Sequence, residues 1–165
     1  MKRSALATCL LLGLGACSGL PERLQNVPVT DVTYKQASKN LSQYDGTSVR
    51  WGGTIVEVKN EQNFTLVQVL AYPLSYTGRP KTREQSPGRF TIKSEKFLDP
   101  EVYEEEREIT VAGTIKGDIE RTVGNRTVRM PLLLGEAVYL WPENYGRGYY
   151  PYYRGHYGPY GPYWY

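Results

Sequence analysis

The sequence predicts a mainly β protein, built as a small five-stranded OB-like barrel with one short helix before the first strand. Three observations support this. From Ser48 onward, apolar residues recur with a period of two. Turn signals separate five main apolar segments. The first segment is long and contains Gly52-Gly53, which suits a bent strand shared by both halves of a barrel. A β-sandwich is the alternative, because periodicity alone does not separate the two architectures.

One helix is predicted between Thr33 and Leu41. Thr33 followed by Gln36 three residues later fits a capping box. Tyr34, Ala37 and Leu41 then fall on one helical face. Asp45-Gly46 is a turn signal that ends this region.

The strands follow in order. The first begins at Ser48 with Val49, Trp51, Gly53 and Ile55 on one face, and its phase changes beyond Ile55, which indicates a bulge or bend beside the two glycines. The second is apolar on both faces and is predicted to be central. A small hairpin arm is predicted at residues 127–130. The other strands are expected at residues 64–72, 90–92, 109–115 and 132–141.

The N-terminus has the pattern of a secretory signal. Lys2 and Arg3 precede a short apolar run, which is too short to span a bilayer. Leu14-Gly15-Ala16-Cys17 then resembles the bacterial lipobox, which implies cleavage before Cys17, a diacylglyceryl thioether on its sulfur and an N-acyl chain such as palmitate. Several acyl chains on one residue give stable membrane anchoring. Ser18, in place of the Asp associated with inner-membrane retention, favours the outer membrane.

These features predict four segments. Residues 1–16 are the signal peptide, 17–30 a lipidated tether, 31–144 the β domain and 145–165 a disordered tail. The chain has two cysteines, Cys9 and Cys17. The first leaves with the signal and the second is modified, so the mature chain has no thiol for disulfides, catalysis or metal binding.

Residues 145–165 are compositionally unlike the rest. Nine are Tyr, five Gly and three Pro, and no acidic residue occurs among them. Gly and Pro at this spacing prevent regular structure, so we predict disorder. Tyr149, Tyr152 and Trp164 are candidate contacts for peptidoglycan or lipopolysaccharide sugars. Stacking on single-stranded nucleic acid also suits such residues, but the lipid anchor makes a nucleic-acid partner improbable.

Several blocks of the chain together resemble the Slp family of outer-membrane lipoproteins, over residues 17 to 143. The blocks are Arg50-Trp51-Gly52-Gly53, Tyr72-Pro73-Leu74, Gly78-Arg79-Pro80, Gly88-Arg89-Phe90, Phe97-Leu98-Asp99-Pro100, Tyr103, Arg107-Glu108-Ile109-Thr110-Val111 and Leu140-Trp141-Pro142. The resemblance implies a starvation- or stress-associated outer-membrane protein without established enzymatic activity, and therefore no catalytic residues or cofactor.

Two candidate binding regions precede the tail, and each has a competing interpretation. Trp51 beside bare glycine backbone suits a stacking platform, but an inward-facing aromatic is more often core packing. Arg79, Lys81 and Arg83 lie in a basic loop, residues 78–89, which suits anionic headgroups or lipid A phosphate. A solvated loop is the favoured interpretation.

The remaining residues do not indicate a catalytic or metal-binding site. The acidic cluster at 101–108 is interpreted as an exposed turn, and Trp141 as a plug at one barrel end. A single His and a formal net charge of +3 argue against a His-based catalytic or metal site and against a nucleic-acid binder. We therefore predict a non-enzymatic envelope protein with a role in envelope structure or stress adaptation. The alternative is a glycan- or lipid-binding module that uses the tail or the basic loop.

Overall fold

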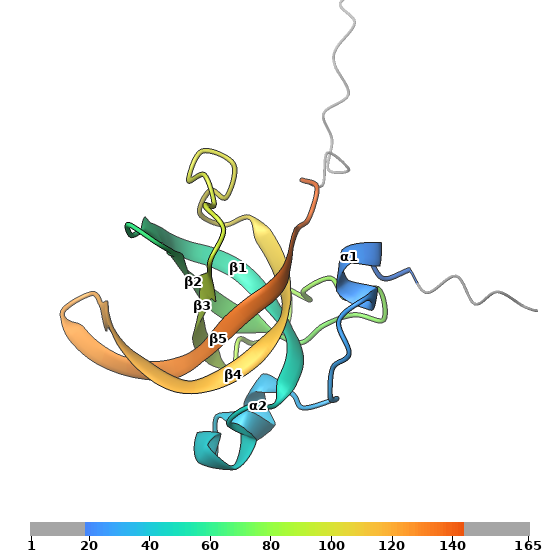
Figure 1. The fold of residues 1–165 in the computed structure, drawn as a ribbon, viewed down its shortest axis with the longest axis horizontal. Helices are drawn as coiled ribbons and strands as arrows, with labels where there is room; N and C mark the ends of the chain where they lie inside the picture. Colours follow the sequence, from blue (N-terminus) through green and yellow to red (C-terminus); the bar gives the residue numbers. More distant parts are fainter. Residues whose placement is uncertain (1–18, 144–165) are drawn as a thin grey trace, which may run out of the picture.

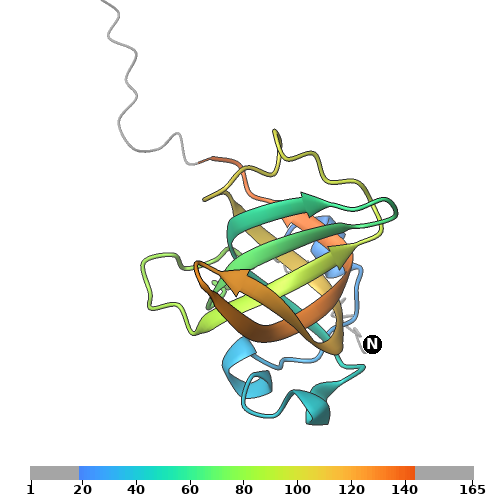
Figure 2. The ribbon, with the colours of Figure 1, turned by 90° about the vertical axis from the view of Figure 1, so that its left-hand side faces the viewer.

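The computed structural model describes residues 19–143, in which five strands form one sheet that closes on itself as a small barrel (Figures 1 and 2). The strands are β1 (Ser48–Asn60), β2 (Thr65–Tyr72), β3 (Gly88–Ser94), β4 (Glu108–Val123) and β5 (Arg126–Leu140). Their order around the barrel is β1-β2-β3-β5-β4. Neighbours are antiparallel except β3 and β5, which are parallel. The predicted mainly β class and the closed five-stranded arrangement are confirmed.

β1 serves both halves of the barrel, as its length and glycines predicted. Its first part pairs with β4, and the part from Gly52 onward pairs with β2. The predicted irregularity is present between Ile55 and Glu57, where the phase of the apolar residues changes, just beyond Gly52-Gly53. Gly53 has a different role, because a Cβ there would overlap the carbonyl oxygen of Leu70 on β2. The glycine therefore permits close strand approach.

The core is formed by the alternating inward residues of all five strands, including Val49, Ile55, Val67, Ile92 and Ile115. β2 is buried on both faces over most of its length, which confirms its predicted central position. β4 and β5 are longer than predicted. They form one extended hairpin through Val123 and Arg126, so the predicted arm at residues 127–130 is the start of β5 and not a separate element.

The predicted helix is present but shorter. α2 (Tyr34–Ala37) begins at Thr33, whose side chain accepts from the Gln36 backbone N–H while the Gln36 side chain accepts from the Thr33 N–H. The capping box is therefore confirmed. The helix ends after one turn, and Leu41–Tyr44 forms a separate 3₁₀ turn, η1. Tyr34, Leu41 and Tyr44 pack against the core.

A further helix, α1 (Glu22–Gln25), was not predicted. It lies within the segment that we expected to be a tether. Leu24 is fully buried, and its carbonyl accepts a hydrogen bond from Arg50 Nη2 at 2.8 Å. Figure 1 shows α1 beside the barrel, on the side of β5. The polar stretch from residue 20 is therefore part of the folded domain.

Candidate functional site

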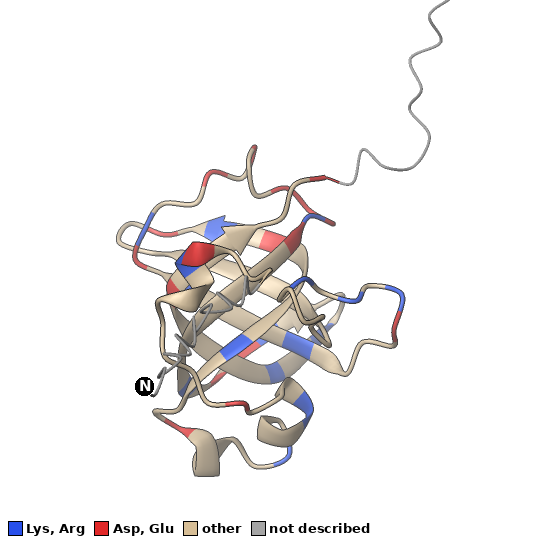
Figure 3. Cartoon of the chain, turned by 90° about the vertical axis from the view of Figure 1, so that its right-hand side faces the viewer, with Lys and Arg blue, Asp and Glu red and all other residues tan. Residues whose placement is uncertain are grey.

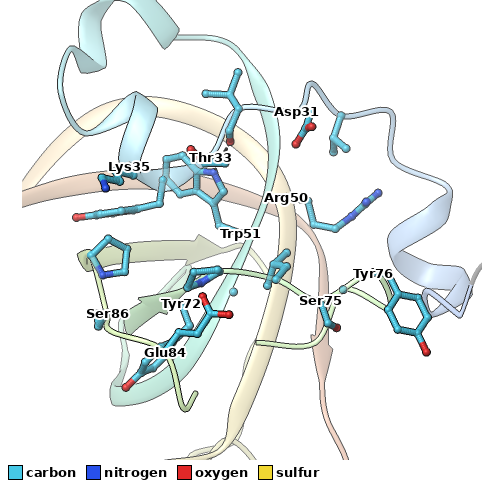
Figure 4. A pocket seen from close by; sticks show the side chains of 18 of the residues that line it. Asp31, Thr33, Lys35, Arg50, Trp51, Tyr72, Ser75, Tyr76, Glu84 and Ser86 are labelled. Atoms are coloured by element: carbon cyan, nitrogen blue, oxygen red, sulfur yellow. Dashed lines mark hydrogen bonds between the residues drawn. The ribbon is translucent and has the colours of Figure 1, made fainter. Parts of the chain in front are cut away.

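The main concavity of the described domain is a cleft of about 1010 Å³ between the N-terminal segment, β1 and the loop that joins β2 to β3. One wall consists of Val29–Lys35, which crosses the start of β1. The other consists of residues 72–78 and 84–87, and Arg50, Trp51 and Gly52 lie between the two walls. Figure 4 shows the side chains of both walls around this space. A cleft of this size accommodates a small molecule or the polar head of a lipid.

Trp51 reaches this cleft only at its edge. Its side chain is 3% exposed, and its indole N–H donates to the Val32 carbonyl at 2.7 Å. Its ring meets those of Tyr34 and Phe90 edge to face, with centroids 5.5 and 5.6 Å away. These contacts favour the packing interpretation, because an inserted ring has no free face for stacking.

Tyr34 links the helix to the barrel at the same end. Its hydroxyl donates to the Arg89 carbonyl at 3.0 Å. Burial raises the pKa of this phenol, because the charged phenolate is disfavoured away from water. Tyr34 therefore remains a neutral donor at physiological pH and fixes the N-terminal segment over β3.

Arg50 is a cation that lines the cleft on the side of α1 (Figure 4). Its guanidinium makes one hydrogen bond within residues 19–143, from Nη2 to Leu24, and its Nε is buried without a partner. None of the ion pairs that the structure describes includes Arg50. Burial lowers the pKa of this guanidinium from its ordinary value, but an arginine stays charged at neutral pH. The cleft also contains Lys35 and the carboxylates of Asp31 and Glu84, so its lining is balanced in charge.

Two of the three candidate cations of the basic loop, for which a solvated loop was the favoured interpretation, are ion-paired. Arg79 is ion-paired with Glu108, donates to the Pro142 carbonyl at 3.1 Å and lies over the Trp141 ring at 5.5 Å. Lys81 pairs with Glu84 at 3.3 Å. Arg83 is exposed and makes none of the described ion pairs. The loop is thus partly neutralised internally, as Figure 3 shows by the acidic segment among its basic ones.

Two other predictions concern individual residues. Trp141 is 8% exposed and donates through its indole N–H to Thr110 Oγ1 at 2.9 Å, but it is not among the residues of the core cluster, so the plug at a barrel end stays a prediction. Glu101 and Glu104–Glu106 are exposed, as expected for a turn. Glu108 departs from that expectation because it is half-buried against Arg79. Cys17, Tyr149, Tyr152 and Trp164 lie outside the described residues.

The structure adds two residues that the sequence did not single out. Arg50 was visible in a motif, but only the fold shows that it lacks an acidic partner. Tyr76 is 94% exposed at one end of the cleft, and no periodic pattern marks it. Among residues 19–143, no group of three or more His, Cys, Asp and Glu side chains is arranged to hold a metal ion. The described helices are all too short to cross a membrane.

Comparison with known proteins gives one family match and several relatives for this chain. The model of the "Outer membrane lipoprotein Slp family" matches residues 14–165. The chain is 29% identical to the outer membrane protein Slp of Escherichia coli (strain K12) over 120 residues, which cover 72% of this chain and 63% of that protein. It is 30% identical to the uncharacterized lipoprotein YeaY of the same strain over 126 residues, which cover 74% of this chain and 64% of YeaY. The matches therefore span under two thirds of the length of these relatives.

Proposed function

The chain belongs to the Slp family of outer membrane lipoproteins, and on this premise we propose that it is a non-enzymatic envelope lipoprotein anchored through lipid on Cys17. The observation that carries the proposal is the arrangement of the N-terminus. A signal-like segment and lipobox end at Cys17, and the part of the chain that the structure describes starts close behind it, at Gly19. The covalent group would be a diacylglycerol thioether with an N-acyl chain, which together give stable anchoring.

The described side chains support a non-enzymatic role. Charged groups of the basic loop are used in structural pairs, Arg79 with Glu108 and Lys81 with Glu84. A catalytic site requires titratable groups that converge on one reacting position. We propose instead a role in envelope structure or in adaptation to stress and stationary phase. Peptidoglycan and lipopolysaccharide are the partners that the aromatic tail would suit.

Fractionation of cells that express Cys17→Ala tests the anchor. The wild-type protein is expected in the outer-membrane fraction, and the variant is expected to lose membrane association or to remain as uncleaved precursor. Ser18→Ala is a matched control that changes the adjacent residue and leaves the acceptor sulfur in place. Outer-membrane sedimentation of mature Cys17→Ala at the wild-type level would contradict the proposal.

A second candidate function is a ligand-binding module, and the cleft is the observation that favours it. The candidate site moves from the basic loop to Arg50, because Arg79 and Lys81 are already paired whereas Arg50 is not. Deletion of residues 145–165 tests the tail separately. If the tail binds glycan, retention on peptidoglycan will fall on deletion, and unchanged retention would exclude the tail as the binding element.

A further inference from the structure

The cleft lies very close to the proposed anchor. Gly19 packs against the loop after β2, where an added Cβ would approach the Thr77 methyl to 3.0 Å. Two peptide units join Gly19 to Cys17, so their Cα atoms are at most about 7 Å apart. Lipid on Cys17 therefore places the loop that contains Thr77 within about 10 Å of the lipid-bearing residue.

Tyr76 is the exposed side chain of this loop. Its ring is 94% exposed, although large apolar rings are usually covered in a soluble domain. Leu20 and Leu74 line the cleft beside it. Tyrosine is enriched where a membrane meets water, since its ring has an apolar body and a polar tip. Tyr76 thus has the chemistry and the position of a residue in the headgroup layer.

Arg50 lies at the same end of the cleft as Tyr76, on the side where α1 begins (Figure 4). A guanidinium has five N–H donors in a planar fork, and within residues 19–143 Arg50 uses one hydrogen bond, to Leu24. Phosphate is a preferred partner of such a fork. Asp31 also lines the cleft and makes none of the described ion pairs, which suits a headgroup that carries an ammonium as well as a phosphate.

We propose that this end of the cleft, formed by Leu20, Arg50 and Tyr76 and here called the headgroup site, binds a phospholipid headgroup of the anchoring membrane. The Tyr76 ring enters the interface and the Arg50 guanidinium pairs with the lipid phosphate. The inference rests on the proposed anchoring through Cys17. It predicts that the domain lies against the membrane in one orientation instead of turning freely on a tether.

The test uses the full mature lipidated chain in vesicles of phosphatidylethanolamine and phosphatidylglycerol. Tyr76→Cys and Phe97→Cys each receive a nitroxide, and collisions with a water-soluble nickel chelate are measured by electron paramagnetic resonance. Phe97 is the matched control, an aromatic that is 71% exposed beside the opposite end of β2, where the neighbouring Leu98 N–H donates to Thr65. The chelate accessibility at position 76 should fall several-fold on vesicle insertion, whereas position 97 should not change.

Equal accessibility at positions 76 and 97 in vesicle-bound protein would overturn the headgroup site and leave the anchor intact. Failure of the lipidated chain to float with vesicles would overturn the anchor itself, through a different readout.

Two further comparisons test the role of the lipid phosphate. Arg50→Gln should raise chelate accessibility at position 76 toward its value in water, Arg50→Lys should do so less, and Arg83→Gln should have no effect. Vesicles of digalactosyldiacylglycerol, which contain no phosphate, should reproduce the Arg50→Gln result with the unsubstituted Arg50. Full protection at position 76 both in these vesicles and in Arg50→Gln would overturn the role of phosphate.

Discussion

Replacement of Trp51 distinguishes a structural residue from a ligand platform. The indole packs edge to face against both the Tyr34 and the Phe90 rings, which also lie 6.3 Å from each other, and it is 3% exposed. Truncation to alanine removes nearly the whole side chain from a packed core, at a cost of about 3–5 kcal/mol in the free energy of unfolding. Trp51→Phe keeps an aromatic ring but leaves the Val32 carbonyl without its 2.7 Å donor, so we expect a smaller loss of about 2–3 kcal/mol.

The assay is equilibrium urea unfolding followed by circular dichroism, with the mature chain carrying Cys17→Ser in every variant so that lipid is absent. Tyr76→Ala is the matched control, because its ring is 94% exposed, and its free energy of unfolding should stay within about 0.5 kcal/mol of the parent. If Trp51→Ala behaved like this control, Trp51 would not be a core residue and the packing account of the first strand would be wrong.

Four further changes follow from the same contacts. Arg79→Ala loses the ion pair with Glu108, the hydrogen bond to the Pro142 carbonyl and the contact with the Trp141 ring, and it should lower the unfolding free energy by about 2 kcal/mol. Arg83→Ala is the control and should change it by less than about 0.5 kcal/mol. Similar urea midpoints for the two variants would contradict the structural role of Arg79. Thr33→Ala removes the capping oxygen and should cost about 1 kcal/mol by thermal unfolding, whereas no loss would show that the cap is unimportant. Gly53→Ala places a Cβ on a neighbouring carbonyl and should reduce the yield of folded protein, which normal yield and stability would refute. Because the pKa of Tyr34 is raised, the stability that its neutral phenol contributes is fully present below the ordinary pKa of 10.0 and is lost as the pH rises through the higher folded value. The loss of unfolding free energy above pH 10.0 should therefore be shallower in Tyr34→Phe. An equally steep loss in this variant would contradict the assignment.

Local patterns predicted most of the fold. The alternation of apolar residues from Ser48 located the strands, because one face of each strand enters the core. The capping box at Thr33 located a helix start, because that pairing is local to four residues. The length of the helix could not be predicted from the local pattern. Tyr34 and Leu41 both pack on the core, but the chain reaches Leu41 through a separate 3₁₀ turn rather than a continuous helix.

The misplaced features are those that depend on contacts between distant segments. α1 has four residues and one buried side chain, Leu24, so its stability comes from the barrel and not from its own pattern. The bulge lies beyond Ile55, where the phase of the apolar residues changes, but the pairing with β2 that fixes it between Ile55 and Glu57 is visible only in the structure. The extended β4–β5 hairpin has an interrupted alternation because the arm projects beyond the core.

In the candidate site, too, local features could be predicted and contacts between distant residues could not. The sequence identified positive residues in the loop at 78–89, but an ion pair between Arg79 and Glu108, which are far apart in the chain, cannot be read from composition. Likewise, Arg50 is a candidate because none of the described acidic side chains forms an ion pair with it, and the sequence cannot show this. The position of Tyr76 near the proposed anchor follows from the packing of Gly19 on the loop after β2. Each of these conclusions required the tertiary structure.

The mass of the N-terminal peptide of the mature protein, purified from outer membranes, tests the central claim most directly. The account predicts a peptide that begins at Cys17 and carries the combined mass of a diacylglyceryl group and one N-acyl chain. An unmodified Cys17, or a mature chain that begins at another residue, would contradict the lipid anchor and the membrane-facing orientation derived from it.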